Sequence, residues 1–231
     1  MKAWSSPVKR RHLIFIILLF PVFFGVLPYF FNYIEKRNGV VLNDLLLAQI
    51  PPHNVSVLIF AVIWGMILLI LYRCLHDPSI LITYCFTLAF VTIARVICII
   101  LVPLSPPIGL IPLSDPLSGV FYGEANITKD LFFSGHTATL MTIFLCLRRK
   151  TDRLIGLLAV VAIAILLLIQ HIHYTIDILA APVIVYLIFS ATKRFFFKDK
   201  RKWKLFRRVR AKAYLAKNKI AKEIPVPENG I

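Results

Sequence analysis

Charged residues are scarce in this sequence, and acidic residues are the scarcest. Asp, Glu, Lys and Arg together make up 16% of the 231 residues, whereas 59% are hydrophobic. Soluble globular domains carry about 25% charged residues. With a mean hydropathy of +0.80, the chain is too apolar for that class. The composition therefore predicts an integral membrane protein built from helices, because a membrane span must bond its own backbone amides.

The sequence also lacks the glycine pattern of a phosphate-binding loop and the cysteine pairs of a metal site. The chain has nine glycines and no glycine-rich phosphate loop, and its cysteines show no paired ligand spacing. We interpret the four cysteines as small hydrophobic residues and expect neither a disulfide nor a metal. A zinc site using His171 and His173 is the alternative, but two histidines two residues apart are poor evidence for one. No cofactor is predicted.

What the sequence does contain is a series of long apolar segments. About 20 apolar residues span a bilayer as a helix. Six segments qualify, and we expect an all-α, polytopic protein with six transmembrane helices at 13–33, 55–75, 79–104, 131–147, 154–172 and 174–195. The first could be a cleaved signal peptide, but its length, two prolines and bulky aromatics favour a retained span.

The basic residues predict the orientation of these spans. If the N-terminus is cytoplasmic and the spans alternate, 23 of the 27 Lys and Arg residues fall on the cytoplasmic side, as the positive-inside rule requires. The division is then a cytoplasmic N-terminus at 1–12, a six-span membrane domain at 13–197 and a basic cytoplasmic tail at 198–231. Both ends are predicted to be cytoplasmic.

The basic tail has its own interpretation. Twelve Lys and Arg residues lie between Lys198 and Lys222, with apolar residues at three- or four-residue spacing. In a soluble protein such a run would suggest nucleic acid. Here it directly follows a span, so we predict an amphipathic tail helix whose partner is anionic lipid at the cytoplasmic surface, and no nucleic acid.

Two polar islands interrupt the apolar sequence, and both fall on the predicted outer side. The first is "DLFFSGHT" at 130–137 and the second is "HYTID" at 173–177. His173 and Asp177 are four residues apart, so the carboxylate can orient the ring and leave its other nitrogen as nucleophile or base. Ser134 is a natural helix N-cap, and the Gly135 and His136 amides would favour phosphate. The alternative is that each histidine only fills a polar gap between helices.

The two islands resemble known motifs. "DLFFSGHT" is similar to the D-x-x-x-S-G-H-T motif of the sphingomyelin synthase family, and "HYTID" is similar to its H-Y-T-x-D motif, within the wider superfamily of type 2 phosphatidic acid phosphatases. The resemblance implies a six-span lipid enzyme that works through a phosphohistidine. It would make His173 the nucleophile, Asp177 its orienting carboxylate and His136 the acid and then the base. It also adds Asp130, Thr137 and Tyr174 to Ser134 and Gly135 as substrate-binding candidates.

Two cations are candidates for holding phosphate charge. Arg95 is the only Lys or Arg deep inside a predicted span and away from its cytoplasmic end, and Lys129 stands where the synthases usually have glycine. The alternative for Arg95 is a core arginine paired with an acid.

Three functions remain open on these residues. The first is transfer of a phosphorylated head group from a phospholipid donor to a ceramide-like or other lipid alcohol. The second is a lipid phosphate phosphatase, with water as the acceptor. The sequence "LLLIQHIH" lacks the arginine that the phosphatases carry before the second histidine, which favours transfer. The third is a membrane scaffold or transporter without enzymatic activity.

Overall fold

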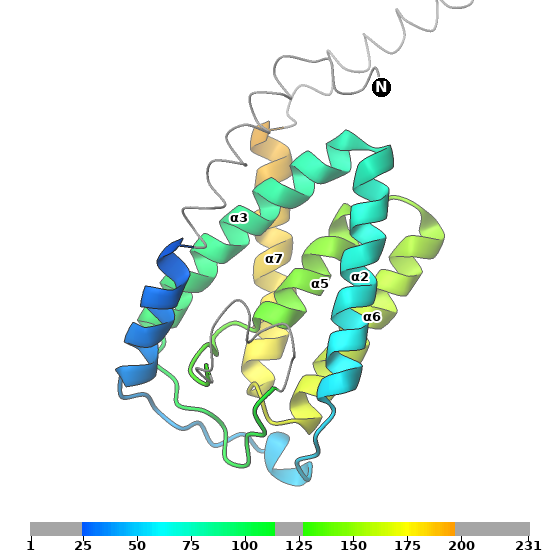
Figure 1. The fold of residues 1–231 in the computed structure, drawn as a ribbon. Coiled ribbons are helices and arrows are strands. Elements are labelled where there is room, and N and C mark those ends of the chain that lie inside the picture. Colours follow the sequence, from blue (N-terminus) through cyan, green and yellow to red (C-terminus); the bar gives the residue numbers. More distant parts are fainter. Residues whose placement is uncertain (1–24, 114–126, 197–231) are drawn as a thin grey trace, which may run out of the picture. The chain divides into compact units, whose positions relative to one another are not determined.

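The computed structural model describes residues 25–113 and 127–196, and these are all-α (Figure 1). The chain divides into two compact units, Met1–Thr192 and Lys193–Ile231. The second is described only at 193–196, the end of the last helix. The N-terminus and tail predicted at 1–12 and 198–231 lie outside the described residues.

Long apolar helices make up most of the first unit. A helical segment at 25–36 comes first. The later elements, in chain order, are η2 (Leu47–Gln49), α2 (Ser56–His76), α3 (Pro78–Leu101), α5 (Gly135–Cys146), α6 (Lys150–Ile169) and α7 (Thr175–Phe196). Within the described ranges, α2, α3, α6 and the 175–194 part of α7 are long and apolar enough to cross a membrane, so the prediction of a multi-pass membrane protein is supported.

The predicted fourth span, at 131–147, is longer than the helix that the structure shows there. Its helix, α5, begins at Gly135 and has 12 residues, which is about 18 Å at 1.5 Å per residue. The bilayer core is about 30 Å thick. The helix is short because Ser134 caps its start and Leu147 turns to extended backbone at its end. The predicted first span lies mostly outside the described residues, so the count of six stays a prediction.

Apolar side chains from five helices, α2, α3, α5, α6 and α7, form the main core. The helix α5 packs against α2, α3 and α6, and α2 also packs against α3 and α6 (Figure 1). Fully buried Ile59, Ile70, Leu140, Ile143 and Ile163 lie in this core. A second cluster joins α3, α5 and α7 beside the first polar island. The starts of α5 and α7 are therefore fixed by apolar packing against the other helices.

Ion pairs join the helices at the end of the bundle that carries the 146–150 connection. Asp152 at the start of α6 accepts two hydrogen bonds from Arg73 near the end of α2, at 2.8 and 3.0 Å. Asp77 caps α3 through the Ser79 amide and also pairs with Arg148 at 2.6 Å. Charge is thus used at this end to tie helix ends together.

Candidate active site

The first polar island forms the capped start of α5. The Ser134 side chain accepts hydrogen bonds from the Thr137 amide at 3.4 Å and from the Thr137 hydroxyl at 3.1 Å. Ser134 and Thr137 are fully buried, and the predicted N-cap is confirmed. His136 follows in the first turn, where the partial positive charge of the helix favours an anion.

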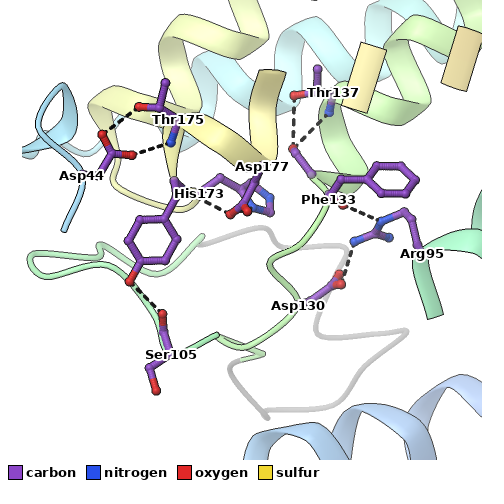
Figure 2. Close-up of polar contacts among 11 residues, drawn as sticks. Asp44, Arg95, Ser105, Asp130, Phe133, Thr137, His173, Thr175 and Asp177 are labelled. Atoms are coloured by element: carbon purple, nitrogen blue, oxygen red, sulfur yellow. Dashed lines mark hydrogen bonds and ion pairs between the residues drawn. The ribbon is translucent and has the colours of Figure 1, made fainter. Parts of the chain in front are cut away.

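The second polar island lies just before α7 and in its first turn. His173 precedes the helix, and its Nδ1 lies 3.6 Å from Oδ2 of Asp177. The same Oδ2 accepts a hydrogen bond from the Tyr174 amide at 3.1 Å. The carboxylate therefore holds the start of α7 and faces the histidine ring at once (Figure 2).

The two islands meet, as the sequence predicts. The rings of His136 and His173 are 6.2 Å apart between centres and lie edge to face. The Ser134 amide also donates to the Asp177 carbonyl at 3.2 Å, so the backbones are joined directly. Among the described residues, Nδ1 of both histidines and Oδ1 of Asp177 are buried without a hydrogen-bond partner. Buried polar atoms are normally paired, and exceptions gather at functional sites.

Arg95 brings positive charge to this site from α3. Its Nε donates to the Phe133 carbonyl at 3.0 Å, and its Nη2 donates to Asp130 at 2.6 Å (Figure 2). A Cβ atom placed on Gly135 would lie 2.6 Å from the Arg95 guanidinium carbon. The absence of a side chain at Gly135 therefore lets the guanidinium lie against the start of α5.

Arg95 is paired with an acid, Asp130, as the alternative interpretation of a core arginine expects. The pair nevertheless lies beside the two histidines, where a phosphate-binding cation would also lie. Burial acts to raise the pKa of Asp130, but the charge and hydrogen bond of Arg95 outweigh it and the net pKa is lowered. Asp130 is thus ionised at neutral pH. Arg95 lies six residues before the end of α3, about 9 Å along the helix, which is shallower than a span ending at 104 would place it.

Lys129, the other predicted phosphate ligand, points elsewhere. Its ammonium group donates to the backbone carbonyls of Glu35 and Arg37, and its amide donates to the Glu35 carboxylate. These contacts join the start of the first island to the end of the helical segment at 25–36. In this structure Lys129 anchors the chain beside the site, and Arg95 is the candidate cation that lies at the histidines.

Tyr174, another predicted substrate ligand, is buried and bonded to two outer segments. Its hydroxyl donates to the Ser105 carbonyl at 2.9 Å and accepts from the Leu42 amide at 3.2 Å. His171, named above in the alternative zinc site, lies with its two ring nitrogens 2.9 and 2.8 Å from the carbonyl oxygens of Ile108 and Ile50. Both residues hold connecting segments together around His173.

Asp44 is a residue that sequence reasoning did not single out. Its carboxylate accepts from the Thr175 amide at 2.6 Å and from the Thr175 hydroxyl at 3.0 Å (Figure 2). It also accepts from the amides of Leu46 and Leu47. An aspartate that accepts from the amides two and three residues after it is a turn motif that a sequence can suggest. Nothing in the sequence near Asp44 indicates its contact with Thr175.

No group of three His, Cys, Asp or Glu side chains in the described ranges is arranged to hold a metal ion. What the site offers is two imidazoles, a carboxylate behind one of them, a helix start and a guanidinium. This set can carry nucleophilic attack, proton transfer and charge stabilisation at a phosphoryl group.

Comparison with known proteins bears on the segment that holds both histidine motifs. Residues 129–194 match the family described as PAP2 superfamily C-terminal, which is the sphingomyelin synthase-like family of that superfamily. A search of curated proteins found no match. The matched segment includes α5, α6 and nearly all of α7, and it leaves Arg95 and Asp44 outside. The part of this chain that carries the two histidines is thus similar to the C-terminal part of the PAP2 superfamily.

Proposed function

We propose that this protein is a membrane phosphotransferase that moves a phosphorylated head group from a phospholipid to a ceramide-like lipid alcohol. The observation that carries the proposal is the pair of imidazoles, 6.2 Å apart between centres, one of which has a carboxylate 3.6 Å behind its Nδ1. Two rings at this separation can both contact one phosphoryl group. The superfamily match supports chemistry on phosphate esters.

The first half of the reaction forms a phosphohistidine. Asp177 faces Nδ1 of His173, which leaves Nε2 to attack phosphorus. The bond between phosphorus and the diacylglycerol oxygen breaks, and His136 gives a proton to that oxygen as it leaves. Arg95 and the first amides of α5 balance the charge on the phosphoryl oxygens. The apo distance of 3.6 Å suits this role, since catalytic hydrogen bonds often tighten only when substrate is bound.

The second half returns the enzyme to its starting state. His136, now neutral, takes the proton of the acceptor hydroxyl. The acceptor oxygen bonds to phosphorus as the bond to His173 breaks. With a lipid phosphate as the donor and water as the acceptor, the same steps give a lipid phosphate phosphatase, which is the second candidate, and the phosphoryl group leaves as inorganic phosphate. Its support is that the matched superfamily includes lipid phosphatases as well as phosphotransferases.

A product analysis tests the proposal. Purified protein is incubated with a phospholipid labelled in its head group or with a lipid phosphate labelled in its phosphate, each with and without ceramide, and the labelled products are identified. Transfer predicts a labelled ceramide product from the phospholipid that depends on added ceramide, whereas the phosphatase predicts labelled inorganic phosphate from the lipid phosphate with or without ceramide. No labelled product of either kind would contradict the proposal.

Variants of the two histidines separate their roles. We expect His173→Ala to abolish turnover and the phosphoenzyme. His136→Ala should block reaction with an alkoxide leaving group but still form phosphoenzyme from a nitrophenyl ester, because nitrophenolate leaves with little protonation. His76→Ala is the matched control, since His76 is exposed at the end of α2 and its ring contacts Tyr72. An acid-labile phosphate mapped to His136 would reverse the assignment.

A further inference from the structure

The start of α7 is held by two carboxylates that come from opposite directions. Asp177, in the first turn of the helix, accepts from the Tyr174 amide at 3.1 Å. Asp44, 131 positions earlier in the chain, accepts from the Thr175 amide at 2.6 Å and the Thr175 hydroxyl at 3.0 Å. The first amides of a helix have no partner within it and attract carboxylates. Here each carboxylate takes one amide.

This division matters because only one of the two carboxylates also faces the histidine. Oδ2 of Asp177 lies 3.6 Å from Nδ1 of His173, whereas Asp44 serves Thr175 and its own turn at Leu46 and Leu47. Burial acts to raise the pKa of Asp44, but its bonds to Thr175 and Leu47 outweigh burial and the net pKa is lowered. Asp44 is therefore an ionised acceptor whose bonds are directed at the helix start.

We propose that Asp44 is a positioning residue for His173: by taking the Thr175 amide, it leaves Asp177 at the imidazole. Without Asp44, the Thr175 amide loses its acceptor, and Asp177, which already accepts from the neighbouring Tyr174 amide, is drawn toward it and away from the ring. His173 then loses the group that orients it. The effect on rate rests on the proposed function, whereas the effect on the ring does not.

The connection runs through a short path in which Asp44 and Thr175 are half-buried and Tyr174 is buried. His173, Tyr174 and Thr175 are consecutive, and the Tyr174 hydroxyl is bonded to Ser105 and Leu42, only two residues before Asp44. Leu42 and Asp44 thus hold the two residues that follow His173, Leu42 through its amide to the Tyr174 hydroxyl and Asp44 through its carboxylate to Thr175. Figure 2 shows the second contact. A shift of residues 42–44 is transmitted to the ring over a few bonds.

The test reads the ring of His173 directly. Protein with nitrogen-15 in its histidines is studied by NMR at neutral pH, and the His173 signals are assigned by their loss in His173→Gln. Wild type should show one tautomer with the proton on Nδ1, facing Asp177. Asp44→Ala should give mixed tautomers, as Asp177→Asn should. An unchanged His173 signal in folded Asp44→Ala protein would overturn the proposal.

Asp77→Ala is the matched control. Asp77 caps α3 in the same way, accepting from the amide and hydroxyl of Ser79 at 2.9 and 2.6 Å, but at the start of another helix and away from the histidines. It should lower the melting temperature without changing the His173 signal. If Asp44→Ala does not fold, Asp44→Asn keeps one acceptor oxygen and should give a smaller change in the same direction. No change in that variant would equally overturn the proposal.

Turnover provides a second reading. Misplacement of a reacting group by about 1 Å can cost about 10²-fold in rate, so Asp44→Ala should lower kcat about 10- to 100-fold and leave KM within about twofold. The double variant with Asp177→Asn should be no slower than Asp177→Asn alone, because both changes remove one interaction. Additive losses would show an independent structural role. If the wild type has no turnover, the proposed function fails and the NMR result still decides the role of Asp44.

Discussion

At Gly135, one added methyl group should lower the catalytic rate while leaving the protein folded. In Gly135→Ala the new Cβ would lie 2.6 Å from Cζ and Nη1 of Arg95 and 2.8 Å from Nη2, whereas ordinary contact begins at 3.4 Å. The guanidinium must therefore retreat by about 0.8 Å, the difference between these distances. It is the far end of a flexible side chain, so the helix start can stay where it is.

The expected loss follows from that displacement. A shift near 1 Å at a catalytic group costs about 10²-fold in rate, which is about 2.7 kcal/mol at 1.36 kcal/mol per tenfold. The stability cost is smaller. Overpacking costs about 1–3 kcal/mol, and replacing a helical glycine by alanine returns about 0.5–1 kcal/mol. We expect Gly135→Ala to fold and to lose about 10²-fold in kcat/KM.

The assay is head-group transfer by purified protein, with the melting temperature measured in parallel. Gly65→Ala is the matched control, because a Cβ at Gly65 in the middle of α2 would meet nothing within 4 Å; it should keep full activity and melt no lower than wild type. The double variant Arg95→Ala/Gly135→Ala should be no slower than Arg95→Ala alone. Full activity in Gly135→Ala, or losses that add in the double variant, would refute the argument.

Three further predictions concern charge. Asp130→Asn should flatten the dependence of melting temperature on acid pH: the pKa of Asp130 is lowered from its usual 3.8, so its ion pair stabilises the fold fully above that value and is lost as the pH falls through the lowered pKa. Arg73→Ala should lower the melting temperature because it leaves buried Asp152 unpaired; an unchanged melting temperature would contradict this. Cysteine-accessibility labelling, in protein lacking its native cysteines, should place Lys129 and Arg149 on opposite sides of the membrane; labelling from the same side would overturn the predicted orientation.

Hydropathy and capping predicted much of the described fold because both are local properties. The helices α2, α3, α6 and α7 begin and end within a few residues of the predicted spans, since long apolar runs have few other options in a bilayer. The cap by Ser134 follows from a hydroxyl just before a helix. The meeting of His136 and His173 follows from the predicted alternation of spans, which places both islands at one end.

The features that the sequence did not predict depend on contacts between distant residues, which produce no local sequence pattern. The bond from Asp44 to Thr175 joins positions 131 apart, and neither residue departs from ordinary loop or helix-start composition. Lys129 is adjacent to the first motif, so sequence proximity suggested phosphate binding. Its ammonium group instead reaches the carbonyls at the end of the segment 25–36. The predicted fourth span is longer than α5 because the apolar residues 131–133 suggest helix from the sequence. In the structure they form the loop before Ser134, which caps the helix.

The charges at the site bear on which phosphate ester it accepts. Arg95 is paired with Asp130 at 2.6 Å, and Asp177 adds a second carboxylate beside His173. With His136 protonated, as the first half of the proposed reaction requires, Arg95 and His136 balance Asp130 and Asp177, so the described side chains at the two histidines carry no excess positive charge. A phosphodiester brings one negative charge and a phosphomonoester brings up to two at neutral pH, so the monoester leaves the greater uncompensated negative charge in the site. This balance favours a phospholipid donor over a lipid phosphate.

A comparison of two chromogenic esters tests that preference. Nitrophenyl phosphorylcholine, a diester, should give a higher kcat/KM than nitrophenyl phosphate, a monoester with the same leaving group. Asp130→Asn removes one negative charge while keeping an acceptor for Arg95, so it should narrow the gap between the two esters by raising the relative use of the monoester. Its matched comparison is Asp77→Asn, which changes the same charge at the ion pair with Arg148 and should leave the ratio unchanged. A wild-type preference for the monoester, or a ratio that Asp130→Asn does not move, would show that these charges do not select the donor.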